Sequence, residues 1–148
     1  ELAGNGGADL IFGGSGDDVL IGGSDADELR GNRGADELHG GIGADTLRGG
    51  RGRDSFVYEA LAESRKTSPD HILDFETGRD TVDVSELVAG TVTWLGTDRF
   101  SKSGVAEARY SLDGDDLDLR IDLDGDGKAE MAILFEDIAR LRAGDFDL

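Results

Sequence analysis

The sequence has no cysteine, one proline and few aromatic residues: six Phe, two Tyr and one Trp among 148 residues. Without cysteine, neither a disulfide framework nor a thiolate metal site can form. No apolar run approaches the length of a membrane span or of a signal-peptide core. The two histidines, His39 and His71, belong to no HExxH motif, and no GxSxG motif occurs. These absences argue against a membrane span and give no support to catalysis by this chain.

Positive charge is also scarce, because 15 Lys and Arg residues face 33 Asp and Glu residues, for a net charge of -18. Such a surface repels the phosphates of nucleic acid, so nucleic acid is not an expected partner and a cation is. The length suits one ordinary domain, or one domain with an elongated extension. Because residue 1 is Glu rather than Met, we expect the chain to be part of a longer protein.

Glycine, by contrast, is abundant, and it recurs in six uninterrupted nine-residue repeats that fill residues 4–57. The repeats read GNGGADLIF, GGSGDDVLI, GGSDADELR, GNRGADELH, GGIGADTLR and GGRGRDSFV. The sixth slot is always aspartate: Asp9, Asp18, Asp27, Asp36, Asp45 and Asp54. The eighth slot is always large and apolar: Ile11, Leu20, Leu29, Leu38, Leu47 and Phe56. A strict recurrence of this kind is not expected of a flexible glycine-rich linker.

The repeat has a direct physical interpretation. Its glycines permit a tight turn, and its last three residues form a short strand whose central side chain faces inward. If two repeats make one turn of a flattened coil, residues eighteen apart stack at a strand spacing of about 4.8 Å. Aspartates stacked so closely repel one another unless a cation lies between them. Calcium fits such a gap because it accepts six to eight oxygens in tolerant geometry, whereas magnesium demands stricter geometry.

The frame resembles the GGxGxDxUx nonapeptide of RTX proteins, which implies a calcium-binding parallel β-roll. In that family, one turn supplies Asp and the carbonyls of its second and fourth slots. The turn eighteen residues later supplies Asp and the carbonyls of its first and third slots. The resemblance thus implies about four or more Ca²⁺ ions, in sites formed by Asn5, Gly7, Asp9, Gly22, Ser24 and Asp27; by Gly14, Gly16, Asp18, Gly31, Arg33 and Asp36; by Gly23, Asp25, Asp27, Gly40, Ile42 and Asp45; and by Asn32, Gly34, Asp36, Gly49, Arg51 and Asp54.

Two features of these turns need comment. Asp25 stands where the frame has glycine, and Asp accepts a left-handed backbone better than most residues. The fifth and sixth turns lack a repeat partner, so any further ion needs ligands from the following segment, for which Asp70 is the candidate.

The inward apolar side chains are too few to offset the ordering of so much glycine-rich backbone, so the repeats are predicted to be disordered without calcium and folded with it.

After residue 57 the composition changes, which predicts a β-roll over 1–57 and a second unit over 58–148. An irregular or briefly helical crossing is expected to end at Pro69. Strands are predicted at 71–75, 80–87, 92–96, 107–112, 116–123 and 130–136. In the run LDLRIDL, the apolar face is Leu117, Leu119, Ile121 and Leu123. The expected aromatic core is Phe75, Trp94, Phe100, Tyr110 and Phe135. This unit would cap the open strand edges of the roll.

The order of RDSFVYEALAESRKTSPDHILDFETGRDTVDVSEL, FSKSGVAEARYSL, IDLDGDGKAEMAIL and the terminal AGDFDL resembles the C-terminal module of secreted serralysin-type metalloproteases. The resemblance implies an all-β fold, with a parallel β-roll continued by an antiparallel β-sandwich. It also implies folding in extracellular calcium and export from a Gram-negative bacterium by a type I ABC system that reads an uncleaved C-terminal signal. Asp147 interrupts the apolar tail that such signals carry. Similar modules occur on alginate epimerases and secreted lipases.

The resemblance further implies that the chain is non-catalytic and serves an upstream enzyme, such as a zinc metalloprotease. The outward side chains of the first coil, in contrast to those of later coils, are apolar: Leu10, Phe12, Val19 and Ile21. We therefore expect a further coil or domain to pack against them. The stretch 122–130, DLDGDGKAE, matches the opening of an EF-hand loop, but Ile133 takes the place of its final Glu. A plain hairpin turn is the favoured interpretation, with an isolated calcium site as the alternative.

Arginines give a second functional hypothesis. Arg30 and Arg48 stack on one face and Arg33 and Arg51 lie in turns, an arrangement that could grip an acidic polysaccharide, as in epimerase modules. The alternative, which we favour, is cross-strand pairing of these arginines with Glu28 and Glu37 on a solvated face.

Overall fold

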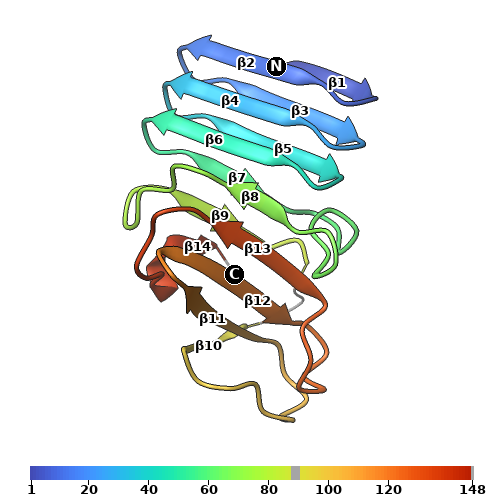
Figure 1. The fold of residues 1–148 in the computed structure, drawn as a ribbon, viewed down its shortest axis with the longest axis vertical. Coiled ribbons are helices and arrows are strands. Elements are labelled where there is room, and N and C mark those ends of the chain that lie inside the picture. Colours follow the sequence, from blue (N-terminus) through green and yellow to red (C-terminus); the bar gives the residue numbers. More distant parts are fainter. Residues whose placement is uncertain (88–90, 148) are drawn as a thin grey trace.

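The computed structural model describes residues 1–87 and 91–147, which form two β-sheets joined along both edges by turns (Figure 1). The strands are β1 (Leu2–Gly6), β2 (Leu10–Ser15), β3 (Val19–Ser24), β4 (Glu28–Arg33), β5 (Glu37–Ile42), β6 (Thr46–Arg51), β7 (Ser55–Val57), β8 (Asp70–Ile72), β9 (Thr81–Asp83), β10 (Thr93–Gly96), β11 (Glu107–Asp113), β12 (Asp116–Asp122), β13 (Met131–Phe135) and β14 (Phe146–Asp147), with a short 3-10 helix η1 (Ala143–Asp145).

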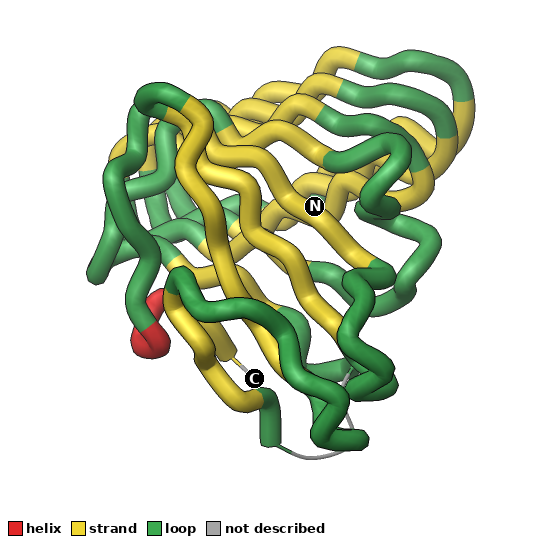
Figure 2. The backbone as a smooth tube through the Cα atoms, turned by 60° about the horizontal axis from the view of Figure 1, so that its bottom comes forward, coloured by secondary structure: helices red, strands yellow, loops and turns green. Residues whose placement is uncertain are grey.

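The repeats form a coil in which successive strands alternate between the two sheets (Figure 2). Strands β1, β3, β5 and β7 lie side by side in one sheet, and β2, β4 and β6 in the other, all parallel to their neighbours. Leu2 pairs with Leu20, and Ile11 pairs with Leu29, so the register is eighteen residues. Two repeats therefore make one turn of the coil, as the sequence predicted.

The inward column of apolar side chains is the core of the roll. The eighth-slot residues of repeats two to six are fully buried: Leu20, Leu29, Leu38, Leu47 and Phe56. Ile11, in the first coil, keeps 8% of its surface exposed. Their chain neighbours are only partly buried or exposed, which is the alternation expected of a strand with one face inward.

The second unit extends both sheets of the roll. Strand β9 joins β7 and then β14 in the six-stranded sheet, whereas β8 joins β6 in the eight-stranded sheet, whose order is β10-β11-β12-β13-β8-β6-β4-β2. The β11, β12 and β13 strands pair antiparallel, as predicted, but β8, β9, β10 and β14 pair parallel. The all-β fold class is thus confirmed. The cap strands belong to both sheets and run in mixed directions, because β8 and β9 continue the parallel progression of the coil.

Aromatic side chains join the roll core to the cap core. The ring of Phe75 lies 5.9 Å from Phe56 and 5.2 Å from Phe135, centroid to centroid. Trp94 packs on Tyr110 and on Phe146, at 5.8 and 4.9 Å. Four of the five predicted core aromatics therefore contribute to one continuous core. The exception, Phe100, is only partly buried and has the Arg109 guanidinium 5.7 Å from its ring centroid.

The crossing between β7 and β8 is irregular and contains turns but no helix. It is fixed by Ser64, whose hydroxyl donates to the Ala132 carbonyl at 2.6 Å and accepts the Asp70 N–H at 2.8 Å. Tyr58, at its start, is 1% exposed. Among the described residues, no helix is long and apolar enough to cross a membrane.

Because Leu38 fills the middle of the inward column, the substitution Leu38→Ala should leave a cavity that lowers the free energy of unfolding by about 2–5 kcal/mol. The measurement is denaturant unfolding in saturating calcium. Ile42, in the same coil but 57% exposed, provides the control, since Ile42→Ala should change stability by no more than about 0.5 kcal/mol. Equal effects at the two positions would contradict the inward orientation of the column.

Candidate metal centre

The repeat aspartates form a hydrogen-bonded ladder along each edge of the roll. The backbone N–H of each aspartate donates to Oδ1 of the aspartate one coil later, with N–O distances between 2.8 and 3.0 Å: Asp9 to Asp27, Asp18 to Asp36, Asp27 to Asp45 and Asp36 to Asp54. One carboxylate oxygen thus serves the backbone, and the carboxylates stack as the eighteen-residue period predicted.

Both ladders continue beyond the repeats. The N–H of Asp45 donates to Asp70 Oδ1 at 2.9 Å, and that of Asp54 donates to Asp80 Oδ1 at 3.1 Å. Asp70 was the candidate from sequence, whereas Asp80 was missed because the intervals are 25 and 26 residues instead of 18. The signal that would have found it is local: DHI and DTV repeat the Asp-x-apolar triplet of the nonads.

The second oxygen of every ladder carboxylate except that of Asp80 has no partner. Oδ2 is buried without a hydrogen bond in Asp9, Asp18, Asp27, Asp36, Asp45, Asp54 and Asp70. The side chains of Asp45 and Asp70 are completely buried, and those of Asp27, Asp36 and Asp54 nearly so. A buried carboxylate oxygen without a partner is costly unless a cation or a proton compensates it.

Backbone carbonyls converge on the same oxygens. At Gly4, the first slot of its repeat, an added Cβ would lie 2.5 Å from Asp9 Oδ2 and 2.8 Å from the Gly22 carbonyl oxygen. An added Cβ at Gly31 would likewise meet Asp36 Oδ2, and the Gly49 carbonyl at 2.7 Å. The first-slot glycines of repeats one to four therefore each leave a space shared by a carboxylate and a carbonyl from the next coil. Hard oxygens around a small space suit a calcium ion.

Other predicted carbonyls point along the roll from the second and fourth slots. The carbonyl oxygens that lie against the glycine one coil later are those of Asn5, Gly16, Gly23, Asp25, Asn32 and Gly34. The non-glycine residues in these slots have left-handed backbones, with φ of 76° at Asn5, 78° at Asp25 and 78° at Asn32. Asn and Asp are the side chains that best tolerate this region, which explains how the repeat accommodates them.

The third-slot carbonyls on one edge already accept hydrogen bonds. The N–H of Gly16 donates to the Arg33 carbonyl at 2.9 Å, and that of Gly34 donates to the Arg51 carbonyl at 3.0 Å. A carbonyl oxygen has two lone pairs, so each keeps one for a further ligand.

Burial raises the pKa of the ladder carboxyls, opposed by the backbone hydrogen bonds to Oδ1. The pKa of Asp45 and of Asp54 rises to about 6, and that of Asp70 to about 8, from 3.8. Desolvation is the largest cause, and neighbouring carboxylates add to it. For Asp45 and Asp70 one of these neighbours is Glu63, on the crossing after β7. The protein thus concentrates like charges at positions where water cannot stabilise them.

The two ladders end differently. Asp80 accepts the N–H of Asp54 and that of Glu76, and Asp74 accepts the N–H groups of Gly49 and Gly50, so both carboxylates are satisfied by backbone. On the other edge, Asp70 Oδ2 and the Tyr58 hydroxyl are both buried and neither makes a hydrogen bond of good geometry, although the hydroxyl lies near enough to Asp70 to oppose the rise in its pKa. The fifth turn therefore retains two buried carboxylate oxygens without a hydrogen bond, Asp45 Oδ2 and Asp70 Oδ2.

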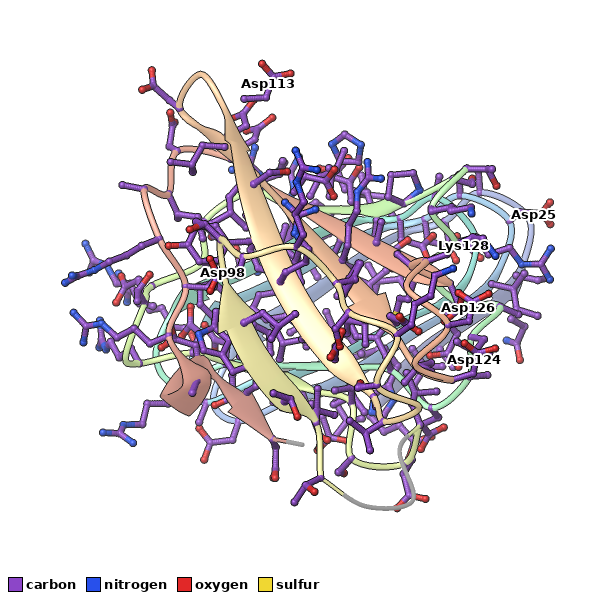
Figure 3. The ribbon with its side chains drawn as sticks, turned by 90° about the horizontal axis from the view of Figure 1, so that it is seen from below. Asp25, Asp98, Asp113, Asp124, Asp126 and Lys128 are labelled. Carbon is purple, nitrogen blue, oxygen red and sulfur yellow. The ribbon has the colours of Figure 1, made fainter. Side chains whose placement is uncertain are left out.

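A separate acidic cluster lies in the turn between β12 and β13. Oxygens of Asp122, Asp124, Asp126 and Glu130 lie within 4.8 Å of one another and could hold a metal ion. In Figure 3, Asp124 and Asp126 lie on the same side of the molecule as Asp25. Asp122 accepts the N–H groups of Gly125 and Gly127 at 2.8 and 2.7 Å, as in a tight hairpin turn. Ile133 stands at the position of the final Glu of an EF-hand loop, but here the fourth acidic side chain of the cluster is Glu130.

The arginines proposed from sequence to contact polysaccharide lie where predicted. Arg30 and Arg48 are register partners on β4 and β6 and line a groove of about 310 Å³ together with Asn32, Gly50 and Asp74. Arg30 also donates from Nε to Glu28 at 2.7 Å, so this pair forms within β4 and not across strands as we expected. His39 contacts Glu37 at 2.6 Å, which is a surface pair.

The chain is similar to proteins of known family and structure. The family model described as Peptidase M10 serralysin C terminal matches residues 7–146. The AlgE6R3 subunit of the mannuronan C5-epimerase from Azotobacter vinelandii is 29% identical, with a TM-score of 0.72, over 95% of this chain and 78% of that one. The AlgE6R2 subunit of the same enzyme is 27% identical, with a TM-score of 0.65, over 95% of this chain and 89% of that one. No curated protein sequence matches.

These similarities agree with the geometry of the ladders. The matched family is a C-terminal module of its peptidases, distinct from their catalytic part, and the epimerase subunits share the β-roll fold. Together with the acidic clusters they support a calcium-binding module. The family match extends over nearly the whole sequence, so the chain belongs to the serralysin C-terminal family of M10 peptidases.

Proposed function

We propose that the chain is a non-catalytic calcium-binding module whose roll is disordered without calcium and folds when several Ca²⁺ ions bind outside the cell. The observation that carries this proposal is the stack of buried Oδ2 atoms that have no protein partner. Two columns of uncompensated carboxylates oppose folding, and a divalent cation between successive members would turn that cost into binding energy.

The four sites expected from the RTX pattern are consistent with the position of these oxygens. Each would take Oδ2 of two aspartates eighteen residues apart, with carbonyls from both turns. The first-slot carbonyls support this assignment most directly, because those of Gly22 and Gly49 border the same spaces as Oδ2 of Asp9 and Asp36.

A fifth ion is proposed at the end of one ladder. Asp45 Oδ2 and Asp70 Oδ2 are fully buried and unpartnered, and the Glu63 carboxylate lies close enough to raise the pKa of both. This site would tie the crossing after β7 to the last full coil. Calcium binding in the roll would thereby extend to the first strand of the cap.

Calcium concentration provides the switch. Extracellular calcium modules bind with dissociation constants of about 10⁻⁴–10⁻³ M, so their sites are empty in the cytosol and filled outside. We propose that the module keeps its parent chain unfolded for a type I ABC exporter of a Gram-negative cell and then stabilises the secreted enzyme upstream. A division at residue 57 into roll and cap fits this sequence of events.

The folded state holds the proposed export signal in place. Strand β14 pairs with β9, and Phe146 packs against Trp94. Asp145 is 1% exposed and accepts the N–H of Gly78 at 2.7 Å. A receptor could read this tail only before the cap folds, which agrees with export of the calcium-free chain. The last residue, Leu148, lies outside the described residues.

Binding of an acidic polysaccharide is a second candidate function, favoured by the similarity to two subunits of a mannuronan-modifying enzyme. The charges that line the groove beside Arg30 and Arg48 argue against binding of an anionic polysaccharide there. Arg30 is paired with Glu28, and the Asp74 carboxylate, which lines the same groove, repels anions.

Calcium removal provides the primary test. In excess chelator the circular dichroism of the isolated chain should lose its β signal, and millimolar calcium should restore it. Magnesium at the same concentration should restore little, because it keeps its water shell. A β spectrum that chelator leaves unchanged would contradict calcium-dependent folding.

Substitution of one ladder aspartate distinguishes a carboxylate that binds a cation from a buried carboxylate that binds none. Asp36→Asn keeps an oxygen for the Asp18 N–H but removes the charge, so the calcium concentration at the folding midpoint should rise roughly tenfold or more. Without a cation site, the same change should stabilise the roll, because it removes a buried carboxylate. Asp17→Asn is the matched control: Asp17 is exposed and accepts the Ala35 N–H at 2.8 Å, and its loss of charge should leave the midpoint within about threefold.

Acidification should act in opposite directions with and without calcium. The folded-state pKa of Asp45, Asp54 and Asp70 lies above the unfolded value of 3.8, so the calcium-free folded state binds more protons than the unfolded state. Its relative stability is therefore greatest below about pH 4 and declines as pH rises through about 6 and 8. In calcium-free buffer the β signal should grow from pH 8 to pH 4. The unfolded carboxyls, with a pKa of 3.8, are ionised above about pH 5, so the calcium midpoint should stay nearly constant from pH 8 to pH 5 and rise as the pH falls toward 4, where protons compete with calcium. A midpoint that stays constant down to pH 3.5 would exclude these carboxylates as ligands.

A further inference from the structure

The two turn edges of the roll carry different charges. Figure 1 shows that the turns at the ends of β2, β4 and β6 lie together along one side of the molecule, which we call the arginine edge: residues 15–18, 33–36 and 51–54. The turns at the ends of β1, β3 and β5 form the opposite, acidic edge: residues 6–9, 24–27 and 42–45. Each edge has four acidic residues in these turns, but the arginine edge also carries Arg33, Arg51 and Arg53, whereas the acidic edge has no Lys or Arg.

The arginines belong to the same turns as the proposed calcium ligands. Arg33 and Arg51 occupy the third slot of their repeats, whose backbone carbonyls are expected ligands. Their side chains are exposed, and within residues 1–87 and 91–147 neither they nor Arg53 form an ion pair. Screening by salt becomes strong only beyond about 8–10 Å, so the charge of each guanidinium acts on an ion held at its own backbone carbonyl.

Ordinary surface pairing does not account for these arginines. Arg33 and Arg51 are register partners, so their Cα atoms stand one strand spacing of about 4.8 Å apart. Like charges placed directly opposite one another are destabilising. The compensating negative charge in the same turns is that of the ladder carboxylates of Asp36 and Asp54, whose Oδ2 atoms have no hydrogen bond. By contrast, Arg30, on the sheet face, is paired with Glu28.

The last turns of the two edges differ in the same sense. On the acidic edge the ladder continues to Asp70, whose buried Oδ2 lacks a hydrogen bond, and Glu63 adds a further carboxylate nearby. On the arginine edge the ladder ends at Asp80, whose two oxygens accept the N–H groups of Asp54 and Glu76. Backbone donors therefore satisfy the last acid of the arginine edge, whereas that of the acidic edge still needs a cation.

We propose that the two edges take up calcium in order, the acidic edge first and the arginine edge at a higher calcium concentration, and that Arg33 and Arg51 set the difference. A cationic side chain disfavours a divalent ion bound at its own residue, because like charges repel. The same side chain offsets the charge of the ladder carboxylates when no ion is present. Both effects make the arginine edge less dependent on calcium. The inference rests on the proposed calcium-binding roll, whose sites it orders.

Ordered filling gives the module two calcium thresholds. Ions on the acidic edge, which includes the proposed fifth site between Asp45 and Asp70, fold the roll and join it to the first strand of the cap. Ions on the arginine edge then stabilise a roll that is already formed. The stability of the folded module thus continues to rise with calcium above the concentration at which it folds.

The test follows backbone amide NMR shifts while the chain is titrated with calcium. Amides that donate to ladder carboxylates report on each edge: Asp9 and Asp27 on the acidic edge, Asp18 and Asp36 on the arginine edge. The calcium midpoint of the arginine edge should be about three- to tenfold higher than that of the acidic edge. Equal midpoints at the two edges would overturn the proposal.

Removal of the two charges should bring the edges together. Arg33→Ser with Arg51→Ser should lower the arginine-edge midpoint about three- to tenfold. Serine is suitable because Ser24 holds the same slot on the acidic edge. The matched control, Arg30→Ser with Arg48→Ser, removes two charges from the same two strands but from the sheet face, and should shift either midpoint less than about twofold. A control effect as large as that of the first pair would refute a role of the third slot.

The reverse change places stacked arginines on the acidic edge. Ser24 and Ile42 are exposed register partners, as Arg33 and Arg51 are. Ser24→Arg with Ile42→Arg should raise the acidic-edge midpoint about three- to tenfold, and with it the calcium midpoint of folding measured by circular dichroism. If both midpoints stay where they are, the third slot does not set the affinity.

Salt gives a readout that a purely structural role of the arginines would not move. Screening weakens the attraction of Ca²⁺ to the acidic edge more than to the arginine edge, whose acids are partly offset already. Raising the salt concentration from about 0.05 to about 0.5 M should therefore narrow the gap between the two midpoints. A gap that does not narrow would count against a charge effect.

Circular dichroism of the same samples keeps the two proposals separate. If calcium folds the chain but both edges share one midpoint, the ordered filling fails and the calcium module stands. If chelator leaves the β spectrum intact while the amide shifts still show the edges filling in order, the calcium switch fails and the difference between the edges stands.

Discussion

The fold depends on the way in which one aspartate in each repeat divides its two oxygens. Oδ1 accepts the backbone N–H of the aspartate one coil earlier, which holds successive coils in register. Oδ2 is left buried without a protein partner. The same side chain thus specifies the geometry of the roll and opposes its formation. A roll built in this way has a defined shape before any ion is considered, but its stability depends on what compensates the second oxygen.

This division explains why the module needs so little apolar core in its first half. The inward column consists of one side chain per repeat, from Ile11 to Phe56. The cap is stabilised differently, by the aromatic cluster around Phe75 and by the antiparallel β11, β12 and β13 strands. Phe56 and Phe75 join the two cores, and Asp70 and Asp80 carry the ladders across the same boundary. Order in the roll and order in the cap are therefore coupled.

The sequence predicts those features that repeat and misses those that occur once. A nine-residue period with invariant Asp dictates the coil, its register and the inward column, because each copy confirms the others. Asp80 escaped prediction because its interval follows loop length and not the repeat. Parallel pairing of β10 with β11 and of β14 with β9 also could not be read from alternation, which indicates a strand but not its neighbour. Glu63 lies on an irregular crossing, where no periodicity points to it.

The third slot of the repeat shows how function can be added without disturbing the roll. The third-slot carbonyls of Arg33 and Arg51 each accept a neighbouring N–H, and both side chains are exposed, so the side chain in this slot is free to vary. Ser24, Ile42 and Arg51 occupy equivalent slots in one continuous coil. Because consecutive turns alternate between edges, substitutions eighteen residues apart change one edge only. A repeat whose interior is fixed by Asp and Gly can in this way carry two chemically different edges.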